Sequence, residues 1–185
     1  MGFGWMLLGW LFMFPTIGNV DILPDFIGFL IMLKGLSCAC KHCRCFDLTR
    51  RLAMFGVLFS LVSWAYQMFC WLDIISASAV GTVMRVAYAV FLCAYAINLA
   101  ISISKIATET ELPKIRVRGA AAVPLAIIML LCGRLAWSGA VSVISSAEKD
   151  ATISETLKWA MRIGYIAEVL FVVYMLLLLL SCYRW

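Results

Sequence analysis

The stretch WAMRIGYIAEVLFVVYMLLLLLSC, residues Trp159–Cys182, decides the class of fold. A helix needs about 20 mostly apolar residues to cross the hydrocarbon core of a bilayer, and this stretch is long enough. The rest of the chain has the same character, because 65% of the 185 residues are hydrophobic and only 14% are charged. A soluble domain of this size cannot bury so much apolar surface. The composition excludes a soluble enzyme, a disordered chain and a nucleic-acid-binding domain, and it predicts a polytopic membrane protein.

Five further apolar segments precede this stretch, at about residues 3–17, 22–40, 52–72, 82–104 and 119–144. We therefore predict an all-α fold in which residues 1–185 form one integral membrane domain of about six transmembrane helices. The first segment is short and is interrupted near its end by Pro15, Gly18 and Asn19. Residues 1–20 therefore either span the membrane or form half of a re-entrant hairpin. Residues 1–14 contain no Lys or Arg, so we expect this segment to be retained rather than cleaved as a signal peptide.

The distribution of basic residues predicts the orientation. Lys and Arg gather in the loops 41–51 and 105–118 and at Arg184, whereas the opposite loops carry mostly Asp and Glu. Positively charged short loops stay in the cytoplasm, so we expect both termini on the cytoplasmic side of a bacterial cytoplasmic membrane. The net charge of +5 is then an orientation signal and no sign of nucleic-acid binding. The expected partner is the lipid bilayer. Other membrane subunits and further copies of the chain are additional candidate partners.

The sequence NVDILPDFIGFL, residues Asn19–Leu30, marks the start of the second segment. Asp21 fits a helix N-cap, and Asp25 fits the first turn, where the helix dipole favours a carboxylate. That interpretation needs no ligand. The alternative is a cation or proton site, because two carboxylates four residues apart share one face of a helix.

The motif DILPDFIGFLI, followed by Gly35 and Leu36, resembles a D-x-L-P-D-F-I-G motif of small multi-pass membrane proteins from Gram-positive bacteria whose function is uncharacterised. The resemblance covers the first two segments and implies a loop-to-helix junction, with no activity attached to it. The size and the predicted number of spans also resemble the substrate-capture subunits of energy-coupling-factor vitamin transporters. Those subunits often carry an A-x-x-x-A pattern on the first span, and this chain lacks it.

Four cysteines and the only histidine gather at the end of the second segment in the pattern C-x-C-x-H-C-x-C. They are Cys38, Cys40, His42, Cys43 and Cys45. Thiolate and imidazole are ligands of zinc and copper(I), so one interpretation is a metal site. A second is thiol exchange through the C-x-x-C of residues 40–43, and a third is a reduced turn without a role. A structural disulfide is not expected on the cytoplasmic side.

Two charged residues fall deep inside predicted spans. Arg134 and Glu168 each lie about 14 Å from the outer ends of the fifth and sixth segments, at 1.5 Å per residue. Adjacent antiparallel helices bring equal depths together, so we predict an ion pair between these two side chains. Arg85, Arg162 and Tyr165 fall in the same outer half of the bundle. Together these residues form either a cluster that fixes the helix register or a cavity for an anionic solute.

These features favour a small-solute transporter, or the membrane-embedded substrate-binding subunit of one. The candidate solute- or ion-binding residues are Arg134, Glu168, Arg162, Arg85, Tyr165, Asp21 and Asp25. The alternatives are a metal- or thiol-handling protein that uses Cys38–Cys45, with zinc or copper as cofactor, and a non-catalytic accessory or assembly protein. No H-E-x-x-H, G-x-S-x-G or P-loop pattern occurs, so we predict no catalytic residue.

Overall fold

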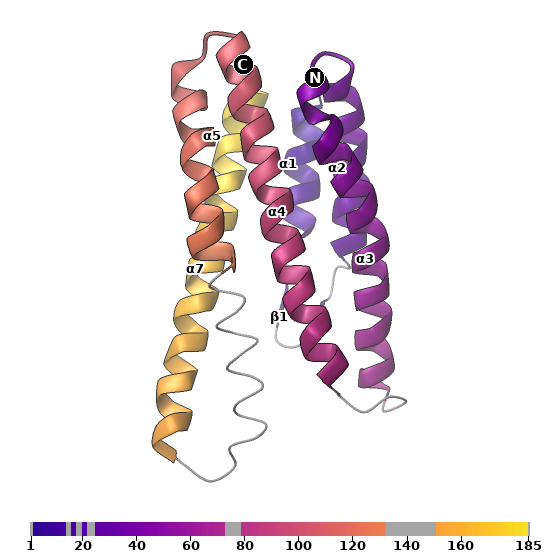
Figure 1. Ribbon diagram of the computed structural model, residues 1–185, viewed down its shortest axis with the longest axis vertical. Helices are drawn as coiled ribbons and strands as arrows, with labels where there is room; N and C mark the ends of the chain where they lie inside the picture. The colour runs from indigo at the N-terminus through magenta and orange to yellow at the C-terminus, as the bar shows by residue number, and fades with distance from the viewer. Residues whose placement is uncertain are drawn as a thin grey trace.

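The protein is described by a computed structural model that covers residues 2–13, 16–17, 20–21, 25–72, 79–131 and 151–184 (Figure 1). Within these residues the fold is helical apart from one pair of very short strands. The helices are α1 (Phe3–Phe12), α2 (Asp25–Cys40), α3 (Asp47–Trp71), α4 (Ala79–Glu109), α5 (Pro113–Leu125) and α7 (Ala151–Tyr183). A 3₁₀ turn, η1 (Arg44–Phe46), leads into α3, and a π-helix, η2 (Ala126–Leu131), continues α5. The strands are β1 (Thr16–Ile17) and β2 (Val20–Asp21).

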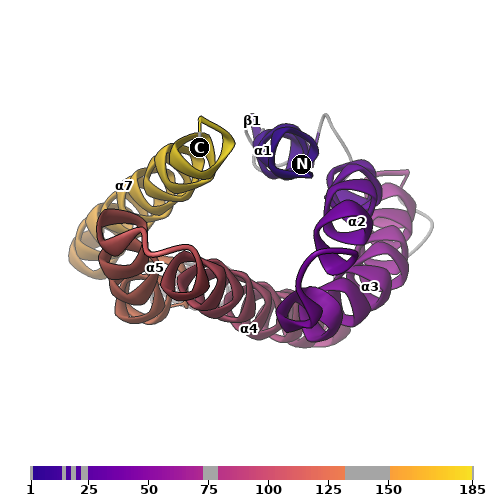
Figure 2. The same cartoon turned by 90° about the horizontal axis from the view of Figure 1, so that it is seen from above.

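The described helices form a ring in chain order when they are viewed along their axes (Figure 2). Each helix packs on its neighbour in sequence, and α1 closes the ring against α7. The start of α1 and the end of α7 lie at the same end of the bundle (Figure 1). A Cβ atom built on Gly4 would lie 3.2 Å from the Tyr183 ring, which places these two helix ends side by side.

Aromatic side chains from four helices meet inside the ring. The Trp10 ring of α1 lies 6.5 Å from Tyr95 of α4 and 6.4 Å from Phe171 of α7, centroid to centroid. Phe29 of α2 meets Tyr95 at 5.2 Å with its ring nearly edge-on. All four side chains are fully buried. Edge-to-face and offset contacts of this kind add to the stabilisation from burial, so this cluster is the centre of the core.

Each helix overlaps one of the six predicted segments. Helices α3, α4, α5 and α7 begin three to eight residues earlier than predicted, whereas α1 and α2 are shorter than predicted. The segment 3–17 forms a helix of only 10 residues, about 15 Å long, and is therefore too short to cross the hydrocarbon core as a helix. The segment 22–40 forms a helix of 16 residues, about 24 Å long. Between the two helices, β1 pairs with β2 in antiparallel fashion. Residues 132–144 of the fifth predicted segment lie outside the described residues.

The placement of Asp21 corrects one prediction. Asp21 pairs with Thr16 in the strand ladder, and α2 begins only at Asp25. Asp21 is therefore not the N-cap of α2, and it does not share a helix face with Asp25. The strand pairing instead holds the Asp21 backbone in an extended conformation beside Thr16, four residues before α2 begins.

Glycines allow α1 and α2 to touch backbone to backbone. A Cβ atom on Gly28 would lie 2.8 Å from the Gly9 carbonyl oxygen, and one on Gly9 would lie 2.7 Å from the Gly28 carbonyl oxygen. Two turns away, a Cβ atom on Gly35 would lie 2.6 Å from the carbonyl oxygen of Gly2. Real Cβ atoms do not approach a backbone oxygen so closely, so no larger residue fits at these positions without a backbone shift. Small residues have this role in helix pairs within membranes.

Three helical stretches are long and apolar enough to cross a membrane: Arg44–Cys70, Val80–Glu109 and Arg162–Tyr183. Their outward faces carry large apolar side chains, such as Leu58, Val83 and Ile163, each 64–66% exposed. A water-soluble monomer rarely exposes contiguous apolar surface on this scale. The prediction of a helical fold with helices long and apolar enough to cross a membrane is confirmed, whereas the number of six spans and the side of the termini stay predictions.

Two local irregularities shape α4 and α5. Helix α4 ends where Glu111 takes a positive φ of 54° and the Leu112 N–H donates to the Ala107 carbonyl at 2.9 Å, an arrangement of the Schellman type. Pro124 lies inside α5 and cannot donate a backbone hydrogen bond, and the helix widens into η2 two residues later. The Cys93 thiol of α4 donates to the carbonyl oxygen of Ala126 at 3.6 Å, which ties α4 to the start of η2.

Candidate functional site

A buried carboxylate joins α2 to α4. The Tyr88 hydroxyl donates a hydrogen bond of 2.5 Å to Oδ2 of Asp25, the first residue of α2. Both side chains are buried, with 9% of Asp25 and 8% of Tyr88 exposed. Tyr88 is the tenth residue of α4 and so lies about 14 Å from the start of that helix. The pair therefore lies inside the bundle and not at its rim.

The surroundings of this pair are aromatic. The Tyr88 ring lies 5.7 Å from Phe59 of α3 and 6.4 Å from Phe91 of α4, centroid to centroid. A carboxylate among such groups is costly unless hydrogen bonds or a positive charge stabilise it. The Tyr88 hydroxyl supplies one such bond. The arrangement can accept a proton or hold a cation, because aromatic faces also attract positive charge.

Tyr95 lies two helical turns beyond Tyr88 on the same face of α4. It is fully buried, and its hydroxyl has no hydrogen-bond partner among the described residues. Most buried polar groups in proteins have a partner, which is often an ordered water or a ligand. An unsatisfied donor therefore lies deeper in the ring than the Asp25–Tyr88 pair, about 10 Å further along the helix axis.

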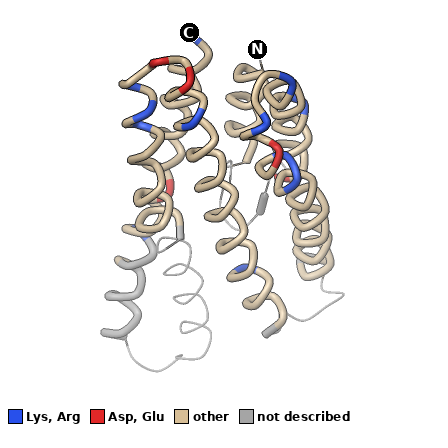
Figure 3. Tube along the Cα trace, turned by 45° about the horizontal axis from the view of Figure 1, so that its top comes forward, with Lys and Arg blue, Asp and Glu red and all other residues tan. Residues whose placement is uncertain are grey.

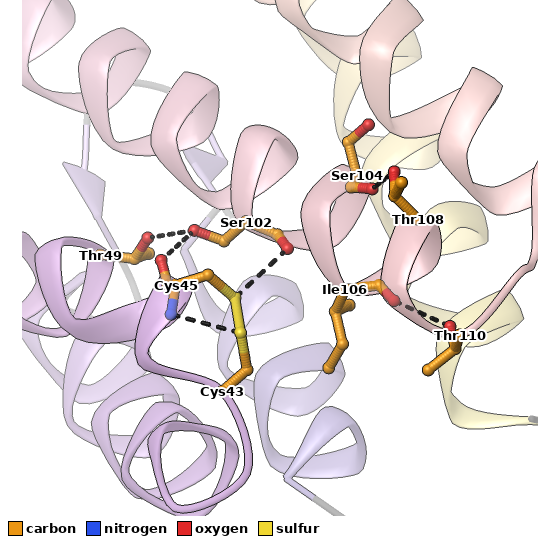
Figure 4. The surroundings of a disulfide bond; sticks show 8 residues. All are labelled: Cys43, Cys45, Thr49, Ser102, Ser104, Ile106, Thr108 and Thr110. Carbon is orange, nitrogen blue, oxygen red and sulfur yellow. Dashed lines mark hydrogen bonds between the residues drawn. A yellow bond between two sulfur atoms is a disulfide. The ribbon is translucent and has the colours of Figure 1, made fainter.

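A second polar cluster lies near the other end of α4 (Figure 4). The Ser102 hydroxyl donates to the carbonyl oxygen of Cys45 at 2.8 Å, and it lies 3.1 Å from the Thr49 hydroxyl. The Sγ atom of Cys45 is 3.7 Å from the Ser102 carbonyl oxygen. Thr49 and Ser102 are buried. These contacts hold the turn between α2 and α3 against α4.

The cysteine cluster does not take the form of a metal site. Among the described residues, which include the whole stretch 38–45, no three His, Cys, Asp or Glu side chains come close enough together to hold a metal ion. Instead, Cys43 and Cys45 form a disulfide bond, while Cys38 and Cys40 are free and partly buried. His42 is exposed. A structural disulfide was not expected in this stretch; the bond closes a turn in which only Arg44 separates the two cysteines.

Of the predicted basic side chains, the two that the structure describes, Arg85 and Arg162, are not enclosed. Both are exposed, and Arg162 stacks over the Trp159 ring, with 5.2 Å from its guanidinium carbon to the ring centroid. Tyr165 is 51% exposed. Glu168 is partly buried on α7, whereas Arg134 lies outside the described residues, so the predicted ion pair between them stays a prediction. These positions give no support to an anion cavity lined by Arg85 and Arg162.

Comparison with protein-family models, with curated proteins and with solved structures finds no match to this chain. The site must therefore be interpreted from its own geometry. Sequence reasoning singled out Asp25 but missed its partner Tyr88, as well as Tyr95 and Ser102. These three residues of α4 are spaced seven apart, and this spacing of polar side chains in an apolar segment is the signal that could have found them.

Proposed function

We propose that the chain is a multi-pass protein of the bacterial cytoplasmic membrane with both termini in the cytoplasm. The charge distribution supports this orientation, because basic residues gather at the end of the bundle where the chain begins and ends (Figure 3). They are Lys34, Lys41, Arg44, Arg50, Arg51, Lys105, Lys114, Arg116, Arg118 and Arg184. On this proposal α3, α4, α7 and α5 with its continuation η2 cross the membrane, and α1 and α2 form a shorter hairpin within it.

Within this frame we propose that the protein binds a small cationic solute and takes part in its transport, as a transporter or as the substrate-binding subunit of one. The Asp25–Tyr88 pair carries the proposal, because an ionisable side chain buried inside a membrane bundle is expensive and is usually kept for function. The aromatic rings around the pair and the buried Tyr95 hydroxyl add groups that suit a desolvated cation. A cation fits this site better than an anion does, since the carboxylate would repel an anion.

Thermal stability in detergent tests this function. The purified protein is heated in the chloride salts of sodium, potassium, choline and putrescine at equal ionic strength, and then in sodium chloride, acetate and phosphate. We expect one cation to raise the unfolding temperature in proportion to the logarithm of its concentration, and the anions to have no differential effect. Asp25→Asn should abolish the shift. Glu109→Gln, which removes an exposed carboxylate at the other end of α4, should retain it.

The remaining outcomes have distinct meanings. An equal shift in wild type and Asp25→Asn would place cation binding elsewhere and overturn the role of Asp25. Selectivity among anions would favour the predicted arginine-lined cavity for an anionic solute over the cation site at Asp25. No shift with any salt would favour a non-catalytic accessory protein. Flux of the identified cation in proteoliposomes then separates a complete transporter from a binding subunit.

A further inference from the structure

The disulfide between Cys43 and Cys45 lies in a turn where a structural crosslink has little to hold together. The two cysteines are separated only by Arg44, and the chain already folds back there through η1. A disulfide stabilises mainly by closing a loop in the unfolded chain, and a loop this short gains least from closure. Stabilisation of the folded chain therefore does not explain why this disulfide bond is present.

The position of the disulfide points to chemistry instead. It lies at the basic end of the bundle, which is the cytoplasmic end on the orientation proposed above. Cytosolic disulfides are usually transient, and they are catalytic or redox-sensing rather than structural. We propose that Cys43 and Cys45 form a thiol–disulfide exchange site whose substrates are carboxylate-bearing low-molecular-weight thiols and their disulfides.

The two sulfur atoms have different surroundings, which assigns them different roles. Cys45 is held on α4, because its carbonyl oxygen accepts from Ser102 and its Sγ atom contacts the Ser102 carbonyl oxygen at 3.7 Å. The Sγ atom of Cys43 instead accepts a hydrogen bond of 3.3 Å from the Cys45 N–H within the same turn (Figure 4). Cys43 is therefore the sulfur that a small thiol attacks, and Cys45 is the leaving sulfur.

The reaction balances with two thiols of the substrate. A substrate thiolate attacks Sγ of Cys43, the Cys43–Cys45 bond breaks, and its electron pair leaves with Sγ of Cys45, which takes up a proton. A second substrate thiolate attacks the sulfur of the substrate in the mixed disulfide, and Cys43 leaves as a thiolate. Two substrate thiols are oxidised to one disulfide, and the two cysteines are reduced. The reverse sequence reduces a substrate disulfide.

The contacts of Cys45 and Cys43 favour the reduced form as well. A disulfide sulfur has no proton to donate, so the 3.7 Å contact of Cys45 with the Ser102 carbonyl becomes a hydrogen bond only when Cys45 is a thiol. The Cys45 N–H remains in place to donate to a Cys43 thiolate. Both oxidation states therefore fit the same backbone, which suits a site that cycles between them.

The charges around Cys43 identify the class of substrate. Lys41 and Arg44 flank it, and both side chains are exposed. Positive charge at the approach to a site attracts anionic reactants and accelerates their encounter. A thiol that carries carboxylates, such as glutathione, fits this surface better than a cationic thiol such as cysteamine.

Redox titration of the full chain in detergent tests the proposal. The protein is equilibrated with stepped ratios of reduced and oxidised glutathione, remaining thiols are blocked with N-ethylmaleimide, and peptide masses report Cys43 and Cys45. We expect both cysteines to become alkylated together as the ratio rises, and to close again when it is reversed. A bond that stays closed in excess reduced glutathione, or one that never forms in oxidised glutathione, would overturn the proposal.

Variants test the assigned roles. Cys45→Ser should accumulate a glutathione adduct on Cys43, whereas Cys43→Ser should leave Cys45 largely unmodified, and Cys38→Ser should titrate like the wild type. Adducts mainly on Cys45 would overturn the assignment. Glutathione should reduce the bond severalfold faster than cysteamine at equal thiolate concentration, and added salt should remove the difference. Equal rates at low salt would overturn the anionic substrate class.

The proposal uses the proposed function only for the side of the membrane. A membrane-impermeant maleimide applied to intact cells, after reduction, tests that side separately. Labelling of Cys43 from outside would overturn the proposed orientation and, with it, the assignment of cytosolic thiols as the substrates. A lack of exchange in the detergent titration would overturn the thiol chemistry and leave the orientation untouched.

Discussion

The α1–α2 hairpin and the α3–α4 pair are both antiparallel helix pairs, but they are held together by different means. In the hairpin the backbones touch through glycines, and each missing Cβ atom is replaced by a carbonyl oxygen of the partner helix. In the α3–α4 pair, side chains fill the interface: aromatic rings such as Phe59 and Phe91, 5.8 Å apart, and the hydroxyls of Thr49 and Ser102. The hairpin therefore depends on the absence of side chains, and the longer pair depends on their presence.

The Asp25–Tyr88 hydrogen bond connects these two parts, since it runs from the start of α2 to the first third of α4. A short hairpin leaves the start of α2 inside the bundle, where a carboxylate is enclosed by longer helices. The shortness of α2 is thus the reason that Asp25 is buried.

The largest effect is expected from Gly28→Ala. The added Cβ atom would lie 2.8 Å from the Gly9 carbonyl oxygen and 2.8 Å from Met13 Cγ, so the helices must separate. We expect a loss of about 3 kcal/mol in the free energy of unfolding, the upper end for overpacking, measured by titration with sodium dodecyl sulfate in mixed micelles. Gly119→Ala is the matched control in α5, where the nearest atoms, on α4, lie 3.2–3.3 Å away. Equal losses for both variants would show that the close backbone contact of the hairpin has no special importance.

The next largest loss of stability is expected when the hydrogen bond between Asp25 of the hairpin and Tyr88 of α4 is removed. Tyr88→Phe removes the hydroxyl that donates to Asp25 and leaves the carboxylate in place. Hydrogen bonds to charged groups contribute about 1.5–3 kcal/mol, so we expect a loss of about 2 kcal/mol in the same titration. Tyr66→Phe serves as a control, because the Tyr66 hydroxyl has no hydrogen-bond partner among the described residues. If both variants lose the same stability, the Asp25–Tyr88 bond does not connect the parts.

Sequence alone predicted the long helices well, because a long apolar segment of a membrane protein has few alternatives to a helix. It placed the ends of α1 and α2 less well, since a two-residue strand pair has no hydrophobic period and Asp21 suits a cap as well as a strand. The glycines were a signal that the prediction did not use: Gly2 and Gly9, and Gly28 and Gly35, are each seven residues apart. That spacing predicts a close helix–helix contact.

The candidate site was only half predictable. Asp25 stands out as a carboxylate in an apolar stretch, but its partner Tyr88 lies 63 residues away. The pairing follows from the order of helices around the ring, which hydropathy does not encode. The disulfide was missed for another reason, since the predicted cytoplasmic side argues against a structural disulfide while the local turn brings Cys43 and Cys45 together.

A smaller effect is expected inside the α3–α4 pair. Ser102→Ala removes the donor to the Cys45 carbonyl and the partner of the Thr49 hydroxyl. We expect a loss of about 1 kcal/mol, which is usual for neutral hydrogen bonds. A double-mutant cycle with Thr49→Val should give a coupling of at least 0.5 kcal/mol, about the lower limit for residues in contact. Strict additivity would show that these hydroxyls do not hold the pair together.

The smallest effect is expected where a side-chain contact assists the glycine-packed hairpin. The ammonium group of Lys34 lies 3.8 Å from the centroid of the Trp5 ring, and both side chains are exposed. Exposed cation–π contacts contribute about 0.5 kcal/mol, so Lys34→Gln should cost no more than that. Lys41→Gln, which removes a charge just beyond the hairpin, should have no effect. A loss from Lys34→Gln comparable to that of Gly28→Ala would mean that side chains hold α1 on α2, and the contrast between the two helix pairs would then be wrong.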